Sequence, residues 1–184
     1  MERRAAAARL VSAEGRLRGI RCGILTASDS VSKGRGEDGS GNYLAETLRA
    51  EGAEVLARVV VPDHLETIAA SLTEMADRLG VDLVLTTGGS GAAPRDVTPE
   101  ATLRVVERQM PGIPEAARIA TASRTPLAML SRAVAGIRGR TLIVNLPGSP
   151  KAFREWMDVI LPVLRHTVEL LHDGKLEWGR EHRP

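Results

Sequence analysis

The sequence predicts an α/β protein built on a mostly parallel β-sheet with helices between the strands. Three short apolar runs rich in β-branched residues, at 21–26, 53–61 and 82–86, have the length of buried strands. Longer segments at 40–51 and 64–79 lie between them and have the length and periodicity of helices. Strands that alternate with helices in this way pair in parallel through right-handed crossovers.

The length and composition favour one domain. The chain has 184 residues, of which 43% are hydrophobic, and this is enough for one sizeable core. We expect residues 1–18 to be a flexible N-terminal extension and residues 19–172 to form the domain. Residues 173–184 read as a polar tail, in which Trp178 is a candidate anchor.

The composition also excludes several classes of function. No apolar run approaches the roughly 20 residues that cross a bilayer, so we expect a cytoplasmic protein with no membrane contact. The charges nearly balance, with 25 Lys and Arg against 23 Asp and Glu, and aromatic residues are scarce. This combination disfavours nucleic acid as a partner. Cys22 is the single cysteine, and its apolar surroundings predict a buried side chain without redox chemistry.

A long polar loop follows the first strand and contains Gly34-Arg35-Gly36-Glu37-Asp38-Gly39. This string matches the dinucleotide pattern G-x-G-x-x-G, but it begins eight residues after Thr26 and carries two acids. An exposed loop is therefore favoured over a nucleotide fingerprint. We expect Ser40 to cap the helix at 40–51, with Asp38 beside its positive end.

The second strand ends at Pro62-Asp63, directly before the helix at 64–79. Asp63-His64-Leu65-Glu66 has the form of a capping box, with an acid at the N-cap and a glutamate three residues later. Spacing alone therefore predicts a capping role for Asp63.

The third strand runs into Gly88-Gly89-Ser90-Gly91. Such a loop either reverses the chain or presents its backbone N–H groups to a phosphate, and spacing leaves both readings open. Thr98 and Pro99 suit the N-cap and first position of a helix at 99–108. Asp96 is then left to act as an Mg²⁺ ligand, the alternative being that Arg95 merely neutralises it.

The remaining pattern predicts a helical stretch at 111–123, a strand at 140–146 and a long helix at 150–172. Ser149 and Pro150 suit the start of that last helix, whose free N–H groups also attract anions. Ligands of open parallel sheets bind at the carboxyl ends of the strands. The polar loops that follow the four predicted strands therefore converge on one edge.

Six segments together resemble the MogA/MoaB family of molybdenum cofactor biosynthesis. They are Thr26-Ala27-Ser28-Asp29, Asp38-Gly39-Ser40-Gly41, Val61-Pro62-Asp63, the stretch 86–101, Leu130-Ser131-Arg132-Ala133, and Asn145-Leu146-Pro147-Gly148-Ser149-Pro150. The most specific is the string T-T-G-G-S-G followed by R-D-V-T-P-E-A. The resemblance covers residues 21–171 and implies a three-layer α/β/α domain around a mostly parallel sheet.

The resemblance also implies an activity, the Mg²⁺-dependent adenylylation of molybdopterin by ATP with release of pyrophosphate. Asp63 and Asp96 match the two essential acids of the family and would hold the Mg²⁺, which replaces the capping interpretation of Asp63. The implied nucleotide and phosphate contacts are Gly88, Gly89, Ser90, Gly91, Pro147, Gly148 and Ser149. The implied pterin contacts are Ser28, Asp29, Ser131 and Arg132, with Arg132 suited to the pterin phosphate.

Members of this family form trimers or hexamers, so the resemblance implies a homo-oligomer. It also implies a downstream partner, a protein that inserts molybdenum. Two alternatives stay open. One is a carrier that binds molybdopterin without turning over ATP, against which the presence of both Asp63 and Asp96 argues. The other is the related domain of nicotinamide-nucleotide salvage enzymes, which the Leu-Ser-Arg-Ala and Pro-Gly-Ser-Pro segments disfavour.

Overall fold

The structure is a computed structural model that describes residues 15–173, and these residues contain one six-stranded sheet. The strands are β1 (Arg21–Ala27), β2 (Glu54–Val61), β3 (Leu83–Thr87), β4 (Arg108–Gln109), β5 (Ala135–Arg138) and β6 (Thr141–Leu146). Their order across the sheet is β2-β1-β3-β6-β5-β4. β2, β1, β3 and β6 are mutually parallel, whereas β5 and β4 continue the sheet in antiparallel pairing. The predicted α/β class with a mostly parallel sheet is confirmed.

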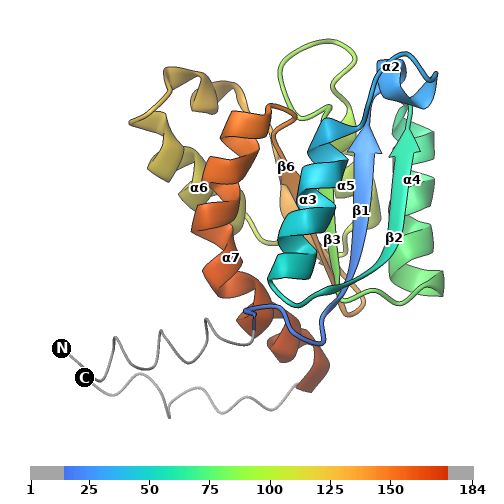
Figure 1. Cartoon of the computed structure of the whole chain (residues 1–184), viewed down its shortest axis with the longest axis vertical. Helices are drawn as coiled ribbons and strands as arrows, with labels where there is room; N and C mark the ends of the chain where they lie inside the picture. Colours follow the sequence, from blue (N-terminus) through green and yellow to red (C-terminus); the bar gives the residue numbers. More distant parts are fainter. Residues whose placement is uncertain (1–14, 174–184) are drawn as a thin grey trace.

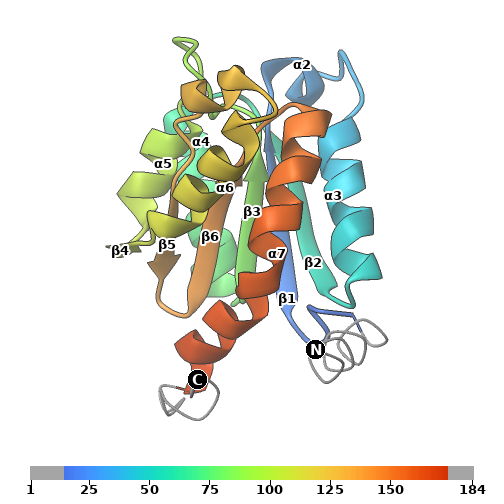
Figure 2. The same cartoon turned by 90° about the vertical axis from the view of Figure 1, so that its left-hand side faces the viewer.

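Helices connect the strands and cover the two faces of the sheet. They are α2 (Asp29–Ser32), α3 (Gly39–Ala50), α4 (Leu65–Thr73) continued by a π-helical turn η1 (Glu74–Arg78), α5 (Thr98–Val105), α6 (Gly112–Ala122), the 3₁₀ helix η2 (Pro126–Leu130) and α7 (Pro150–Asp173). One face carries α3, α6 and α7, and the other carries α4 and α5 (Figures 1 and 2). The sheet is thus the middle of three layers.

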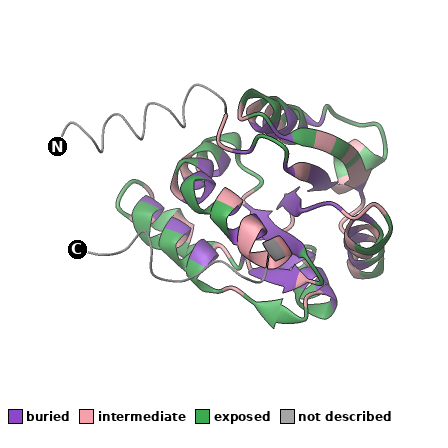
Figure 3. Ribbon diagram, turned by 90° about the horizontal axis from the view of Figure 1, so that it is seen from below, coloured by how far each residue is buried: buried purple, intermediate pink, exposed green. Residues whose placement is uncertain are grey.

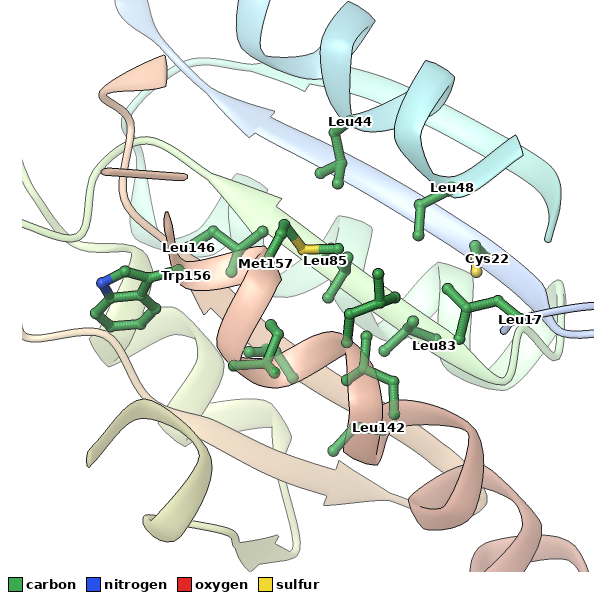
Figure 4. Close-up of a cluster of buried hydrophobic side chains, with 14 of the residues drawn as sticks. Leu17, Cys22, Leu44, Leu48, Leu83, Leu85, Leu142, Leu146, Trp156 and Met157 are labelled. Carbon is green, nitrogen blue, oxygen red and sulfur yellow. The ribbon is translucent and has the colours of Figure 1, made fainter. Parts of the chain in front are cut away.

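Each face of the sheet buries its own apolar cluster. On the α3, α6 and α7 face, Leu85 and Leu142 of the strands pack with Leu44, Trp156 and Met157 of the helices (Figure 4). The α4 and α5 face is a separate cluster of aliphatic side chains. The buried residues lie on the strands and on the inward sides of the helices (Figure 3). Burial of a strand on both faces explains why β3 reads as a continuous apolar run rather than an alternating one.

The polar ends of the chain fall only partly within the described residues. Leu17 is fully buried in the core, and its N–H donates to the Glu51 carbonyl at 2.7 Å. Residues 15–18 are therefore packed on the domain, although they belong to the expected flexible extension. Residues 1–14 and the tail from residue 174, including Trp178, lie outside the described residues. Among residues 15–173, no helix combines the length and the apolar character needed to cross a membrane.

The predicted helix at 99–108 was wrong at its end. α5 stops at Val105, because Val106 adopts an extended conformation and the chain enters β4. The Glu107 N–H donates to the Ile137 carbonyl at 2.8 Å and the Met110 N–H to the Ala135 carbonyl at 2.8 Å, so long-range pairing overrides the helical pattern here. Strands as short as β4 and β5 carry too few residues for a period to show.

The predicted helix caps at Ser40, Asp63 and Thr98 were also wrong. Asp38 caps α3 by accepting from the Gly41 N–H at 2.9 Å, whereas the Ser40 hydroxyl donates to the Gly148 carbonyl at 3.2 Å. His64 and Val97 occupy the N-cap positions of α4 and α5, and neither makes a side-chain cap. The three side chains expected as caps instead form hydrogen bonds with neighbouring loops at the carboxyl edge of the sheet.

The start of α7 agrees with the sequence. Pro150 is its first residue, and the carbonyl of Ser149 accepts from the Phe153 N–H at 2.9 Å, as the carbonyl of an N-cap residue does.

Candidate functional site

The glycine loop after β3 is pressed between β1 and the start of α5. Gly88 and Gly89 have φ values of +88° and +62°, which side chains other than glycine rarely adopt. A Cβ on Gly88 would lie 2.2 Å from the Ala27 carbonyl oxygen, and a Cβ on Gly89 would lie 2.4 Å from Thr98 Oγ1. The Thr98 hydroxyl closes the loop by donating to the Gly88 carbonyl at 3.0 Å. Both glycines are therefore required by space as well as by conformation.

The same loop is fastened to the turn that follows β6. The Ser90 hydroxyl donates to the Leu146 carbonyl and the Thr87 hydroxyl to the Pro147 carbonyl, each at 3.2 Å. A Cβ on Gly148 would lie 3.2 Å from the Cα of Gly88. The predicted phosphate loop and the predicted Pro147-Gly148-Ser149 loop are thus in direct contact, although they are far apart in sequence.

Asp63 approaches Gly89 from the β2 side of the loop. Its Oδ2 accepts from the Asp29 N–H at 2.9 Å, and its Oδ1 lies 3.1 Å from the position that a Gly89 Cβ would occupy. Partial burial raises the pKa of Asp63, and the negative charges of Asp29 and Asp96 raise it further, against the Asp29 N–H and Arg95, which lower it. Asp63 and Asp96 therefore share one electrostatic environment.

Asp96 closes a tight turn within the loop that leads to α5. Its Oδ2 accepts from the Ala93 N–H at 2.8 Å, and the Asp96 N–H returns a hydrogen bond to the Ala93 carbonyl at 2.8 Å. A Cβ on Gly91 would lie 2.9 Å from the same Oδ2, so glycine at 91 leaves room for the carboxylate. Asp96 therefore has a structural role through one carboxylate oxygen, which the sequence did not indicate.

Arg132 holds this loop from outside. Its Nε donates to the Gly91 carbonyl at 2.7 Å, its guanidinium also contacts the Asp96 carbonyl and the Glu100 carboxylate, and its backbone N–H donates to the Ser90 carbonyl at 2.9 Å. The guanidinium meets the backbone of Asp96 and leaves the carboxylate of Asp96 unneutralised. The sequence did not predict these contacts of Arg132 with the loop, since no sequence pattern places residue 132 beside residues 90–100.

A cavity of about 520 Å³ opens between the glycine loop, η2 and the start of α7. It is lined by Gly89, Ser90, Gly91, Asp96, Thr121, Thr125, Leu127, Ala128, Leu130, Ser131, Pro147, Gly148, Ser149, Lys151, Ala152, Glu155 and Trp156. All the predicted phosphate contacts except Gly88 line it, with Ser131 from the predicted pterin contacts. Gly88 lies behind the loop against Ala27.

The other predicted site residues lie outside this cavity. Ser28 and Asp29 begin α2 beside Asp63, where the Ser28 hydroxyl accepts from the Val31 N–H at 3.3 Å as a helix cap. The candidate site therefore has two parts separated by the Gly89 backbone. One part is the cavity with Asp96, and the other is the Asp63 and Asp29 corner.

Sequence reasoning missed the wall of the cavity formed by α6, η2 and α7. Lys151, Glu155 and Trp156 lie in the first two turns of α7, and Thr121 and Thr125 lie at the end of α6 and just beyond it. The helical pattern of 150–172 gives the side of the helix that is apolar. It gives no sign that the first turns face a cavity rather than a neighbouring element.

The acids fit a metal that arrives with a substrate. Within residues 15–173 no group of three or more His, Cys, Asp or Glu side chains is arranged to bind a metal. Mg²⁺ is commonly held by one or two carboxylates, with substrate phosphates and waters completing its shell. Asp63 and Asp96 each commit Oδ2 to a backbone N–H, and Oδ1 has no hydrogen bond within the described residues. Two such carboxylates, one on each side of the glycine loop, have the chemistry to hold Mg²⁺ that arrives with a phosphorylated substrate.

Comparison with known proteins identifies the family of the chain. Residues 23–166 match a family described as a probable molybdopterin binding domain. The chain is 43% identical over 154 residues to a molybdopterin adenylyltransferase of Helicobacter pylori strain J99, covering 83% of this chain and 88% of that one. It is 41% identical over 141 residues to the molybdopterin adenylyltransferase of Escherichia coli K12, covering 76% and 72% of the two chains.

Solved structures show the same fold. The molybdopterin biosynthesis enzyme MoaB of Thermus thermophilus superimposes with a TM-score of 0.79 at 49% identity, covering 85% of this chain and 98% of that one. A CinA protein of Thermoplasma acidophilum has a TM-score of 0.61 at 19% identity over 82% of this chain and 99% of that one, which shows a shared fold alone. From the matched residues and these relatives, the chain belongs to the MogA/MoaB family of molybdopterin-binding proteins.

Proposed function

We propose that this chain acts in molybdenum cofactor biosynthesis as a nucleotidyltransferase that adenylylates molybdopterin with ATP. The observation that carries the proposal is the junction of three features at one edge of the sheet. These are the glycine loop, the acids Asp63 and Asp96 on either side of it, and the 520 Å³ cavity that the loop lines. Identity above 40% to two molybdopterin adenylyltransferases supports this reaction over others that such a site would permit.

In the proposed reaction an oxygen of the terminal phosphate of molybdopterin attacks the α-phosphorus of ATP. A bond forms between that oxygen and the α-phosphorus, the bond from the α-phosphorus to the bridging oxygen breaks, and pyrophosphate leaves with the electron pair. Phosphoryl-type transfers of this kind ask a protein mainly to position the groups and to stabilise the charge. The site offers both without needing a nucleophile of its own.

The backbone of the glycine loop and the start of α7 supply the proposed contacts with phosphate. Gly89 and Gly91 leave room for the side chains of Thr98, Asp63 and Asp96, and both line the cavity with backbone. Gly148 and Ser149 lie at the beginning of a 24-residue helix, where unpaired N–H groups and the helix dipole favour anions. Lys151 lines the same cavity and adds a positive charge.

Asp63 and Asp96 would hold Mg²⁺ on the triphosphate. When bound, the Mg²⁺ neutralises charge that builds up on the departing pyrophosphate. The protein keeps these carboxylates ready by fixing each through one oxygen and leaving them without an arginine or lysine ion pair among residues 15–173. Acids whose pKa is perturbed and whose charge has no ion-pair partner cluster at functional sites, so we attribute the unpaired state of these two to the ligand.

On the pterin side we propose Ser28, Asp29 and Ser131 as contacts. Arg132 was expected to bind the pterin phosphate, but its guanidinium already contacts the Gly91 and Asp96 carbonyls and the Glu100 carboxylate. We propose that Arg132 fixes the loop that carries Asp96. We also propose a cytoplasmic homotrimer or hexamer that passes its product to a molybdenum-inserting protein, a proposal that rests on the family resemblance.

The test is a turnover assay with purified protein, molybdopterin, ATP and Mg²⁺. We expect adenylylated pterin and pyrophosphate in equal amounts, and a loss of at least about a hundredfold in rate for Asp96→Asn, a change that preserves an acceptor for the Ala93 N–H. Asp77→Asn is the matched control, because Asp77 is an exposed acid that pairs with Arg138 and lies near the end of η1, a helix length away from Asp63 before α4. Bound pterin without any pyrophosphate release by the wild type would instead identify a carrier.

A further inference from the structure

One connection in the chain forms most of one wall of the cavity. After α6 ends, residues 123–134 pass through η2 and return to the sheet. This connection contributes Thr125, Leu127, Ala128, Leu130 and Ser131 to the cavity. Within it, the Ala128 N–H donates to the Thr125 carbonyl at 3.1 Å and the Ser131 N–H to the Ala128 carbonyl at 3.2 Å. Such local hydrogen bonds fix the shape of a turn, but its place in the domain depends on how its two ends are held.

The near end is held by the last turn of α6. Thr121 is buried there, and its carbonyl accepts from the Arg124 and Thr125 N–H groups, each at 3.0 Å. The Thr121 hydroxyl donates in turn to the Ala117 carbonyl at 2.7 Å. This end of the connection is therefore fixed by the helix from which it leaves.

The far end is held by a single side chain, that of Arg118 on α6. Its Nη1 donates to the Ala133 carbonyl at 2.9 Å and makes a longer hydrogen bond of 3.5 Å to the Ser131 carbonyl. Ala133 is buried, and no other donor reaches its carbonyl within residues 15–173. A buried carbonyl that loses its donor is costly, so the position of this segment depends on the guanidinium.

The charge of Arg118 is used on backbone oxygens alone. Among the described residues it forms no ion pair with an acid, and hydrogen bonds from a charged donor are stronger than neutral ones. Between the two carbonyls that it binds, the Arg132 N–H donates to the Ser90 carbonyl at 2.9 Å. The segment 131–133 is thus held between α6 on one side and the glycine loop on the other.

We propose that Arg118 is a positioning residue that holds Ser131 in the cavity wall for the pterin. Arg118 is not among the residues that line the cavity, so it acts through the backbone of the segment 131–133. This role rests on the proposed function, in which Ser131 contacts the pterin. ATP should be less affected, because the hydroxyls of Thr87 and Ser90 fasten the loops of its proposed phosphate contacts independently of Arg118.

The experiment is calorimetric titration of the full-length protein with molybdopterin and, separately, with ATP and Mg²⁺. Arg118→Met keeps an unbranched side chain but has no donor. We expect it to weaken molybdopterin binding at least about tenfold and ATP binding by less than about threefold. Arg118→Lys keeps the charge and can reach one carbonyl but lacks the planar fork, so we expect about a threefold loss of molybdopterin affinity.

A second measurement tests the physical cause without a substrate. In Arg118→Met the backbone amides of residues 124–134 should exchange hydrogen at least about tenfold faster than in the wild type, because this connection opens locally. Arg124→Met is the matched control. Arg124 is an exposed arginine just beyond α6 that does not line the cavity, so its loss should leave both affinities and the exchange rates unchanged.

The proposal would be overturned by an Arg118→Met protein that binds molybdopterin within about twofold of the wild type. Equal losses of molybdopterin and ATP affinity, together with a lower melting temperature, would also overturn it and show general destabilisation. A loss confined to ATP would do the same, since the wall would then serve the nucleotide. Failure of the proposed function is separable. In that case the wild type would release no pyrophosphate in the turnover assay, while Arg118→Met would still bind molybdopterin more weakly than the wild type.

Discussion

Two acids at opposite ends of the sheet show how differently this fold uses a carboxylate. Asp82, just before β3, has a side chain only 8% exposed and accepts from the Arg21 N–H and guanidinium at 2.8 Å. Asp63, just after β2, accepts one backbone N–H and has no ion pair among the described residues. The protein supplies hydrogen bonds and a positive charge to the carboxylate of Asp82, whereas it supplies one hydrogen bond to that of Asp63.

The pKa values of the two acids move in opposite directions. Burial acts to raise the pKa of Asp82, but the hydrogen bonds and charge of Arg21 outweigh it and hold this pKa below its usual value. Partial burial raises the pKa of Asp63, and the neighbouring carboxylates add to the effect. A carboxylate whose charged form the protein stabilises contributes to folding, whereas one whose charged form is disfavoured is a candidate for function.

The arginines at the two ends make the same contrast. The guanidinium of Arg21 neutralises the carboxylate of Asp82, whereas that of Arg132 binds the backbone carbonyl of Asp96. The amino end of the sheet is thus assembled from complementary charges. At the carboxyl edge the arginine binds the backbone of the loop, and the carboxylate of Asp96 has no ion pair among the described residues.

The largest expected effect comes from Asp63→Asn. We expect pyrophosphate release to fall by at least about a hundredfold, because the charge that would hold Mg²⁺ is gone. The melting temperature near neutral pH should stay equal or rise, since the raised pKa means that the charged form is disfavoured in the folded protein. Parallel thermal melts and turnover assays check this pair of outcomes. A large drop in melting temperature would show that Asp63 is structural and would remove the contrast with Asp82.

Changes at Arg132 should have an intermediate effect. Arg132→Lys cannot reproduce the forked contacts with Gly91, Asp96 and Glu100, so we expect about a tenfold loss of turnover and a higher Mg²⁺ requirement. Stability should change little, because the side chain is 41% exposed. Turnover measured across a Mg²⁺ titration tests this. If Arg132→Lys instead keeps the wild-type affinity for Mg²⁺ but binds pterin more weakly at saturating Mg²⁺, then Arg132 contacts the substrate.

Asp82→Asn, the matched change at the other end, should have the smallest effect on catalysis. We expect turnover to stay within about twofold while stability falls by about 1–2 kcal/mol, as charge-assisted hydrogen bonds are weakened. Because the pKa of Asp82 is lowered, its stabilisation is present above the unfolded-state pKa and disappears as pH falls through the folded-state value. Denaturant unfolding of both proteins should therefore differ at pH 7 and converge in strong acid. A constant difference across pH would show that the ion pair contributes nothing.

Most of the fold could be predicted from the sequence, because the longer helices and strands have the apolar patterns that are typical of each. β1, β2, β3 and β6 are apolar runs, and α3, α4, α6 and α7 are helical segments of ordinary length, so their order indicated the parallel sheet. The elements it missed, α2, β4, η2 and β5, each have five residues or fewer and depend on partners distant in the chain. Val106 adopts an extended conformation where the chain enters β4, which pairs with β5.

The candidate site divides in the same way. The sequence by itself determined which loops leave the carboxyl ends of the strands, and its motifs indicated the family. Only the tertiary structure decided that Thr98 closes the glycine loop, that Asp63 accepts from Asp29, and that Lys151 lines the cavity. Periodicity records which side of an element is apolar, but a polar side chain takes its partner from whatever segment the packing brings beside it. That choice is made by contacts across tens of residues, which no local pattern encodes.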